Sequence, residues 1–337
     1  MTVTIGFVGA GGIAEWQHFD IVEARDDVEV AGICDVNQAA ASEAAERFDA
    51  TAYTDHEKLY DGEDLDAVFV CIPPFAHGPA EIAAAERGID LFVEKPLALS
   101  VERAREIREA IEDAGVLAGV GYDWRYSRGV ERAQELLADR TIATIEGRWW
   151  GGVPGEDGHW WREFEKSGGQ IVEQATHVYD TVRLLAGDVE AVSGAGSHRI
   201  VDAVDFADST SVTMEHESGT ISHVSTTCAA EDHDAHLEVV ADGATLRITE
   251  EEISGTVDGE DVEDSFDVNP YAVEVDAFVE AIAADDAGPI RSTYDDAFDT
   301  FALTMAANEA LDADGRVEPA TADGGADGSL ESAEADQ

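Results

Sequence analysis

Two segments of the sequence carry side chains suited to moving protons. Lys95 directly follows a predicted strand over residues 90–94, lies beside Glu94, and is one of three lysines in the chain. A partly buried ammonium at that place could bind a substrate hydroxyl and stabilise the negative charge that develops on its oxygen. The alternative is an ion pair between Glu94 and Lys95 that only fixes a turn.

The second segment is a predicted helix over residues 170–186, which carries Glu173, His177 and Asp180 on one face. Histidine is the side chain that most readily exchanges a proton near neutral pH, and neighbouring acids set its tautomer and its pKa. We therefore expect His177 to accept a proton and Glu173 to orient it, unless this face is only solvated. The segment offers no third ligand, so we expect no metal site.

A glycine-rich run, Gly9-Ala10-Gly11-Gly12-Ile13-Ala14, joins a predicted strand over residues 3–8 to a predicted helix over residues 13–25. Gly9 permits a tight turn, and Gly11 lets the backbone approach a pyrophosphate. The helix N-terminus around Gly12 and Ile13 supplies hydrogen-bond donors to phosphate oxygens. A glycine turn without any ligand is the alternative reading.

Asp35 directly follows the second predicted strand, over residues 28–34. A carboxylate about 20 residues beyond such a glycine run can bind the ribose hydroxyls of a dinucleotide. The same carboxylate would repel a 2′-phosphate, and residues 36–38 include no arginine or lysine to hold one. The pattern therefore predicts NAD as the cofactor and disfavours NADP.

Several further candidates lie where predicted parallel strands end. Open parallel sheets bind ligands beyond the carboxyl ends of their strands. A predicted strand over residues 66–72 ends with Cys71 and is followed by Pro73 and His77. We therefore expect these three residues to lie near the cofactor, and we expect the same of Glu94 and Lys95. His77 could instead only begin the next helix.

Residues 1–122 alternate apolar runs of strand length with helical segments. This rhythm predicts an α/β domain of the Rossmann type, a doubly wound parallel sheet that binds NAD(P). Residues 123–311 contain helices around 128–137, 170–186, 270–284 and 295–311, and strand-like runs at 142–150, 191–197, 209–216, 220–228, 236–241 and 245–249. We predict an α+β domain there, with a large, mostly antiparallel open sheet that binds substrate and supports oligomerisation.

Three smaller features complete the pattern. Four of the six tryptophans fall between Trp149 and Trp161, and one of them, with Trp161 as our candidate, could stack on a sugar ring; core or dimer packing is equally compatible. Residues 232–236 contain two histidines and two aspartates, which we interpret as a solvated acidic turn. Residues 312–337 are acidic and poor in large apolar side chains, which predicts a disordered tail.

The composition limits the partners and the compartment. The chain has 74 Asp and Glu against 20 Lys and Arg, a formal net charge of −54. Such a chain cannot release counterions from nucleic-acid phosphates or adsorb to anionic membranes. The acid excess instead predicts a solvated surface for a salt-rich cytoplasm. Three cysteines without a Cys-x-x-Cys, and no signal segment, predict a reducing cytoplasmic location.

Taken together, five motifs resemble the Gfo/Idh/MocA family, which includes glucose–fructose oxidoreductase and inositol dehydrogenase. The excess of acidic residues resembles that of proteins from haloarchaea, so we expect a haloarchaeal member of the family. The five motifs are G-A-G-G-I-A, C-I-P-P-F-A-H, F-V-E-K-P-L, G-Y-D-W-R-Y and G-G-Q-I-V-E-Q-A-T-H-V-Y-D. The resemblance implies Lys95 as the lysine of the E-K-P motif, His177 and Asp180 as the histidine and last acid of D-x-G-x-H-x-x-D, and Arg125 as a pocket residue. Glu173 departs from the usual aspartate.

The resemblance also implies an activity. We expect an NAD-dependent oxidoreductase that moves hydride between nicotinamide and a secondary alcohol or ketone of a sugar, polyol or inositol-like substrate. We expect Arg125, Trp161 and Asp180 to bind that substrate, and a homodimer or homotetramer to form through the open sheet. The alternatives are a glycosidase or eliminase that retains its NAD, and a non-catalytic NAD-binding sensor.

Overall fold

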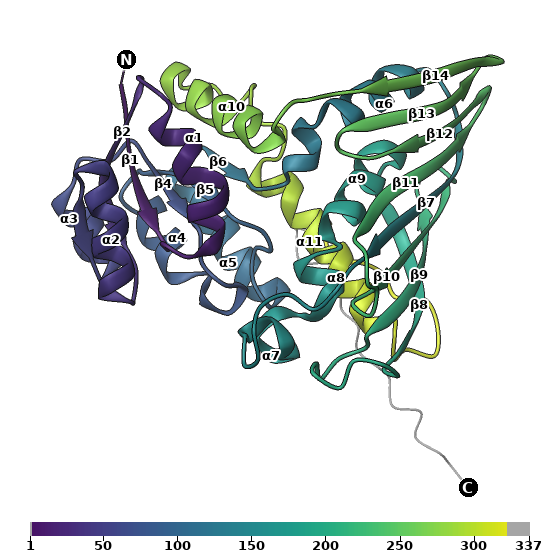
Figure 1. The fold of residues 1–337 in the computed structure, drawn as a ribbon, viewed down its shortest axis with the longest axis horizontal. Coiled ribbons are helices and arrows are strands. Elements are labelled where there is room, and N and C mark those ends of the chain that lie inside the picture. Colours follow the sequence, from purple (N-terminus) through teal and green to yellow (C-terminus); the bar gives the residue numbers. More distant parts are fainter. Residues whose placement is uncertain (1, 322–337) are drawn as a thin grey trace, which may run out of the picture.

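The computed structural model of the chain describes residues 2–321, and within them two sheets lie side by side (Figure 1). The first has 6 strands, all parallel, in the order β3-β2-β1-β4-β5-β6. Its strands are β1 (Val3–Val8), β2 (Val28–Cys34), β3 (Thr51–Tyr53), β4 (Ala67–Val70), β5 (Asp90–Val93) and β6 (Ala118–Val120). The order reverses between β1 and β4, which creates the crevice where doubly wound sheets bind ligands.

Short helices connect these strands on both faces of the sheet (Figure 1). They are η1 (Ala14–His18, a π turn), α1 (Phe19–Glu23), α2 (Gln38–Phe48), α3 (His56–Gly62), η2 (Pro74–Ala76), α4 (Pro79–Ala85) and α5 (Val101–Ala114). Helix α5 has side-chain and glycine caps: the Ser100 side chain accepts the N–H of Arg103, and Gly115 ends the helix in a left-handed conformation. Strand β3 and helix α3 were not predicted from the sequence.

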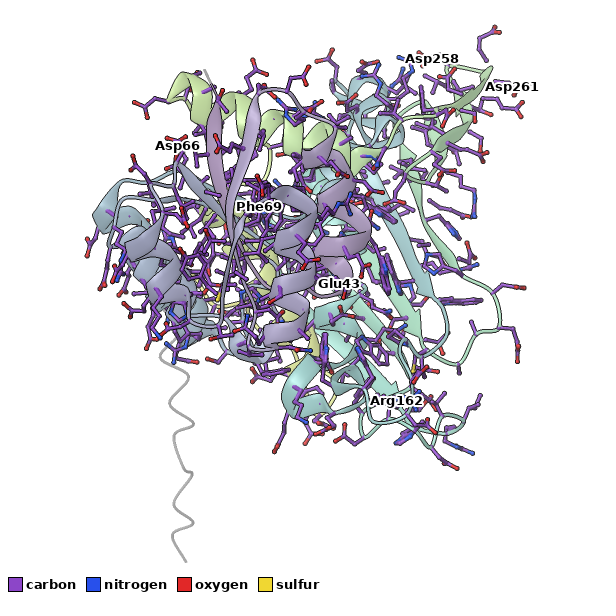
Figure 2. The ribbon with its side chains drawn as sticks, turned by 60° about the vertical axis from the view of Figure 1, so that its left-hand side comes forward. Glu43, Asp66, Phe69, Arg162, Asp258 and Asp261 are labelled. Atoms are coloured by element: carbon purple, nitrogen blue, oxygen red, sulfur yellow. The ribbon has the colours of Figure 1, made fainter. Side chains whose placement is uncertain are left out.

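A helix from late in the chain completes the first domain. Helix α10 (Pro270–Ala284) packs on the parallel sheet, and its Phe278 ring meets the rings of Phe69 and Phe92 at centroid distances of 5.5 and 5.4 Å. Figure 2 shows Phe69 in the interior of this domain. The division of the sequence at residue 122 therefore does not coincide with the division of the core.

The second sheet has 8 strands in the order β14-β13-β12-β11-β7-β10-β9-β8, and only the pair β7–β10 is parallel. The fold class predicted from the sequence is therefore confirmed. The strands are β7 (Ile142–Trp150), β8 (Val189–Ser197), β9 (Ser209–His216), β10 (Ile221–Thr227), β11 (Asp234–Ala241), β12 (Ala244–Ile248), β13 (Glu252–Val257) and β14 (Glu260–Ser265).

Helices cover one face of this sheet and join it to the first domain. They are η3 (Asp123–Tyr126), α6 (Arg128–Leu137), η4 (Trp160–Arg162), α7 (Phe164–Ser167), α8 (Gly169–Glu173), α9 (Thr176–Ala186) and α11 (Tyr294–Glu309). In Figure 1, α6, α9 and α11 lie between the two sheets. Acidic side chains crowd the outer surface, for example Asp258 and Asp261 at the tip of β13 and β14 (Figure 2).

Two local predictions were wrong. The helix expected over residues 170–186 breaks after Glu173, because the N–H of Ala175 bonds the carbonyl of Gln170, one residue beyond α-helical spacing. The start of the expected disordered tail is instead ordered: Val317 exchanges both backbone hydrogen bonds with Val192 on β8, at 2.8 and 2.9 Å. Residues 322–337 lie outside the described part of the chain.

Within residues 2–321, no helix is both long enough and apolar enough to cross a membrane.

Candidate active site

The glycine-rich loop follows β1 at the point where the strand order reverses. Gly9 has φ +101°, and a Cβ there would collide with the carbonyl of Cys71 on the neighbouring strand, so only glycine fits. An added Cβ at Gly11 would meet no heavy atom within 4 Å, so the backbone there is open to a ligand. Gly12 and Ile13 lead into η1. These features fit a dinucleotide pyrophosphate at the loop.

Asp35 lies against the same loop. Its carboxylate accepts the backbone N–H of Ala10 at 2.9 Å and that of Asn37 at 2.7 Å. These bonds hold the acid at the end of β2, next to the place where the loop would cradle a pyrophosphate. The position agrees with a carboxylate that binds ribose hydroxyls and repels a 2′-phosphate.

The residues after β4 form a buried corner beside the loop. Burial raises the pKa of the Cys71 thiol well above its usual range, so this side chain is no nucleophile at neutral pH. Pro73 precedes η2, and His77 follows it. The His77 Nδ1 atom bonds the Glu81 carboxylate, while its buried Nε2 has no hydrogen-bond partner in the described chain. That nitrogen is available to a polar group of a bound cofactor.

Glu94 and Lys95 follow β5 and have different partners. The Glu94 carboxylate bonds Nε2 of the buried His18 at 2.7 Å, which ties the end of β5 to η1. The Lys95 ammonium donates to the backbone carbonyl of Glu173 at 2.9 Å and lies 3.6 Å from the Glu173 carboxylate. Lys95 thus reaches across to the second domain, and the peptide between Lys95 and Pro96 is cis.

Trp161 holds the acid that faces this lysine. Its indole N–H donates to Oε2 of Glu173, and the tryptophan is 1% exposed. The prediction that Trp161 stacks on a sugar ring is therefore wrong, because the ring is enclosed by neighbours that include Phe206. The structure makes it part of a chain of contacts from Trp161 through Glu173 to Lys95.

His177 lies beside an acid that the sequence analysis did not select. Its Nδ1 atom is 3.1 Å from Asp123, whereas Glu173, expected to orient it, faces Lys95 because of the break between α8 and α9. Burial, with a smaller contribution from the Lys95 charge, lowers the pKa of His177 well below 6.5. Its imidazole is therefore neutral at neutral pH and able to accept a proton.

Asp123 is itself coupled to a second carboxyl group. Burial, and then the negative charge of Glu250, raises the pKa of Asp123 well above its usual range, and burial also raises the pKa of Glu250. Two interacting carboxyl groups retain a proton that neither would retain alone. The His177 ring therefore has a proton-bearing acid pair on its Nδ1 side.

These groups surround one cavity of about 630 Å³. The Trp149 ring is nearly parallel to the His177 ring at a centroid distance of 5.9 Å, and His233 lies against the edge of Trp149. The cavity is lined by Gln17, Asp123, Trp124, Trp149, His177, His233, Asp234, Ala235, Thr249, Glu250, Glu251, Glu252 and Tyr271. The segment 232–236 is thus part of the cavity wall rather than only a solvated turn.

Arg125 and Asp180, both expected to bind substrate, form a buried ion pair. Nε and Nη2 of Arg125 donate to the Asp180 carboxylate at 2.7 and 2.6 Å, and Thr300 also donates to it at 2.8 Å. Neither side chain is among those that line the cavity. The pair joins η3, which carries Asp123, to α9, which carries His177. A role in positioning these elements therefore replaces the expected substrate contact.

Asp123, Glu250 and His233 were missed as site residues for different reasons. Asp123 directly follows the β6 region and could have been found by the strand-end rule that selected Lys95. Glu250 and His233 come from loops beside β12 and β11, and no local spacing connects them with His177.

Comparison with known proteins agrees with this architecture. The model of an oxidoreductase family with an NAD-binding Rossmann fold, Gfo/Idh/MocA, matches residues 3–122, and the C-terminal domain model of that family matches residues 130–247. A solved levoglucosan dehydrogenase in complex with NADH has the same fold, with a TM-score of 0.84 at 19% identity over 95% of this chain and 100% of its own.

Two curated relatives cover most of both chains. D-xylose 1-dehydrogenase (NADP(+)) 2 of Haloferax volcanii is 26% identical over 82% of this chain and 88% of its own length. The scyllo-inositol 2-dehydrogenase (NAD(+)) of Bacillus subtilis is 25% identical over 73% of each. With its glycine loop, its two sheets and the match to both family models, the chain belongs to the Gfo/Idh/MocA family of oxidoreductases.

Proposed function

We propose that this protein is an NAD-dependent dehydrogenase that oxidises a secondary alcohol of a sugar, polyol or inositol-like substrate, or reduces the corresponding ketone. The observation that carries the proposal is the neutral His177, which lines a polar cavity and lies within electrostatic reach of Lys95, the residue that follows β5 and Glu94. The xylose and inositol dehydrogenases among the relatives support the substrate class.

The first domain supplies the cofactor site. Gly9, Gly11, Gly12 and Ile13 would hold the pyrophosphate, Asp35 the ribose, and the corner of Cys71, Pro73 and His77 would flank the nicotinamide end. When bound, NAD supplies the nicotinamide carbon that accepts a hydride. Asp35 favours NAD over NADP, although the Haloferax relative is named for NADP.

In oxidation, His177 would accept the proton of the substrate hydroxyl. Asp123 lies 3.1 Å from its Nδ1 atom, so a ring proton on that nitrogen would leave Nε2 as the accepting nitrogen. Lys95 would donate a hydrogen bond to the same substrate oxygen and stabilise its negative charge as the C–H bond breaks. Glu173 and Trp161 would fix the ammonium, and in reduction the proton transfers reverse.

The direct test is a panel of sugars, inositols and polyols with NAD in about 2 M KCl, followed at 340 nm. Reduction of NAD by one neutral member is expected, and replacement of Lys95 or His177 by alanine should abolish turnover while NADH fluorescence titration still reports binding. Turnover that survives both substitutions would contradict the assigned roles. NAD that is retained while a glycosidic bond is cleaved would favour the glycosidase alternative.

Two further properties belong to the same proposal. The net charge of −54 supports activity in a salt-rich cytoplasm, because molar salt screens the self-repulsion. The eight-stranded sheet, with its helices gathered on one face, supports a homodimer or homotetramer. Light scattering in 2 M KCl and in 0.1 M KCl would test both, with a defined oligomer expected only at high salt.

A further inference from the structure

Buried carboxyl groups surround the cavity that holds His177. Asp123 is 1% exposed and lines the cavity, and neither of its oxygens has a hydrogen bond with good geometry within the described residues. Glu274 is also 1% exposed, and neither of its carboxyl oxygens has a hydrogen-bond partner among residues 2–321. The charges of Asp123 and Glu94 add to burial in raising the pKa of Glu274, so the three groups lie within electrostatic reach of each other.

Positive charge is scarce in the same place. The described residues that line the cavity include five acids, Asp123, Asp234, Glu250, Glu251 and Glu252, and no lysine or arginine. Lys95 lies nearby, but the Glu173 carboxylate 3.6 Å away offsets its charge. Arg148 and Arg247 pair with Asp234 at 3.0 and 3.4 Å and so neutralise only that edge.

The acid-rich composition of the whole chain does not account for these groups. Surface acids are solvated and fully screened in molar salt, whereas Asp123, Glu94 and Glu274 are buried. Retaining carboxyl groups inside a protein is costly unless they meet a partner. Burial keeps Glu274 protonated, whereas Asp123 and Glu250 share a proton, so this pair retains one negative charge in the cavity wall. Because Asp123 is buried, salt screens this charge less than it screens the surface acids.

From this we infer that the cavity selects sugars or polyols that are uncharged or carry a protonated amino group, and rejects those that carry a carboxylate or a phosphate. The inference rests on the proposed function and names the substrate class of the same site. An amino substituent would gain a charged hydrogen bond from a carboxylate in the wall. An anionic substituent would place a like charge beside the Asp123–Glu250 pair, and among residues 2–321 no arginine or lysine lines the cavity to offset it.

The test compares four sugars that share one ring and differ in one group: glucose, glucosamine, glucuronate and glucose 6-phosphate. The corresponding pentose and inositol compounds are compared in the same way. Each is titrated into the NADH-loaded full-length protein in 2 M KCl, with the fluorescence of NADH as the readout. We expect the anionic members to bind roughly 30-fold more weakly than the neutral parent, as for like charges about 8 Å apart at an effective dielectric constant near 20.

A double substitution, Asp123→Asn with Glu250→Gln, removes the buried pair, because a single change would leave the other carboxyl ionised. It should reduce the ratio of the affinities for neutral and anionic sugars at least tenfold. The matched control, Glu251→Gln with Glu252→Gln, neutralises two exposed acids at the rim and should change it less than threefold.

Binding of the anionic members as tightly as the neutral parent would overturn the inference. Loss of the difference between neutral and anionic sugars in the control variant, Glu251→Gln with Glu252→Gln, would also overturn it. NAD reduction by only a phosphorylated or carboxylated sugar would overturn it and leave the proposed function intact. Neither binding nor turnover with any member would overturn both.

Discussion

Replacing Trp161 by phenylalanine tests how the protein positions its lysine. The substitution keeps a buried ring but removes the indole N–H that bonds Glu173. A hydrogen bond to a charged group contributes about 1.5–3 kcal/mol. Lys95 keeps its 2.9 Å bond to the Glu173 carbonyl, so we expect the lower part of that range, a loss of about 10- to 30-fold in kcat/KM at roughly 1.4 kcal/mol per factor of ten.

The assay is steady-state NAD reduction with the best neutral substrate, together with NADH titration and thermal unfolding of each variant. The loss should fall on kcat, and NADH affinity should stay within twofold, because Trp161 lies away from the glycine loop. Trp160→Phe is the matched control, since its partly exposed ring contacts Phe75 and carries no bond to Glu173. Equal kcat/KM in the Trp161 variant and the wild type would refute the positioning argument.

The remaining predictions concern the site, the cofactor and stability. Asp123→Asn should lower kcat about 100-fold with little change in KM, because His177 loses the group that orients its proton. Lys95→Met should abolish most turnover and, since the Lys95 charge helps to lower the pKa of His177, move that pKa upwards in an NMR titration. Asp35→Ser should shift the NADP/NAD preference at least tenfold towards NADP in paired kinetic assays. Asp208 accepts three backbone N–H groups that lower its pKa to about 2 from 3.8, so Asp208→Asn should cost about 2 kcal/mol of unfolding free energy at pH 7. That difference should vanish as the pH falls through 2, and a pH-independent difference in urea unfolding would contradict it.

Local rules predicted much of the fold. The glycine loop, the strands around Cys71 and before Lys95, and the strand-like runs at 209–216 and 220–228 all follow from short-range spacing, and the last two pair as the antiparallel β9 and β10. Strand β14 was missed because Val262 is its one apolar residue among acids, and β13 was missed because Ser254, Gly255 and Thr256 separate Ile253 from Val257. Their hairpin closes at Asp258, which has φ +52°.

The pairing inside the site could not be read from the sequence. Helical spacing assigned Glu173 to His177, but a single irregular hydrogen bond at Ala175 turns Glu173 towards Lys95. The true neighbour of His177 is Asp123, which lies far from it in the sequence and approaches only when η3 packs against α9. Such contacts depend on tertiary packing, which no local pattern encodes.

The central claim is tested most directly by following a hydride. A neutral sugar or polyol that is a substrate would be labelled with deuterium at the carbinol carbon and incubated with the protein and NAD in 2 M KCl. We expect one deuterium on the nicotinamide ring for each ketone formed, and none with Lys95→Met. Substrate conversion that leaves NAD undeuterated and unreduced at every time point would contradict it.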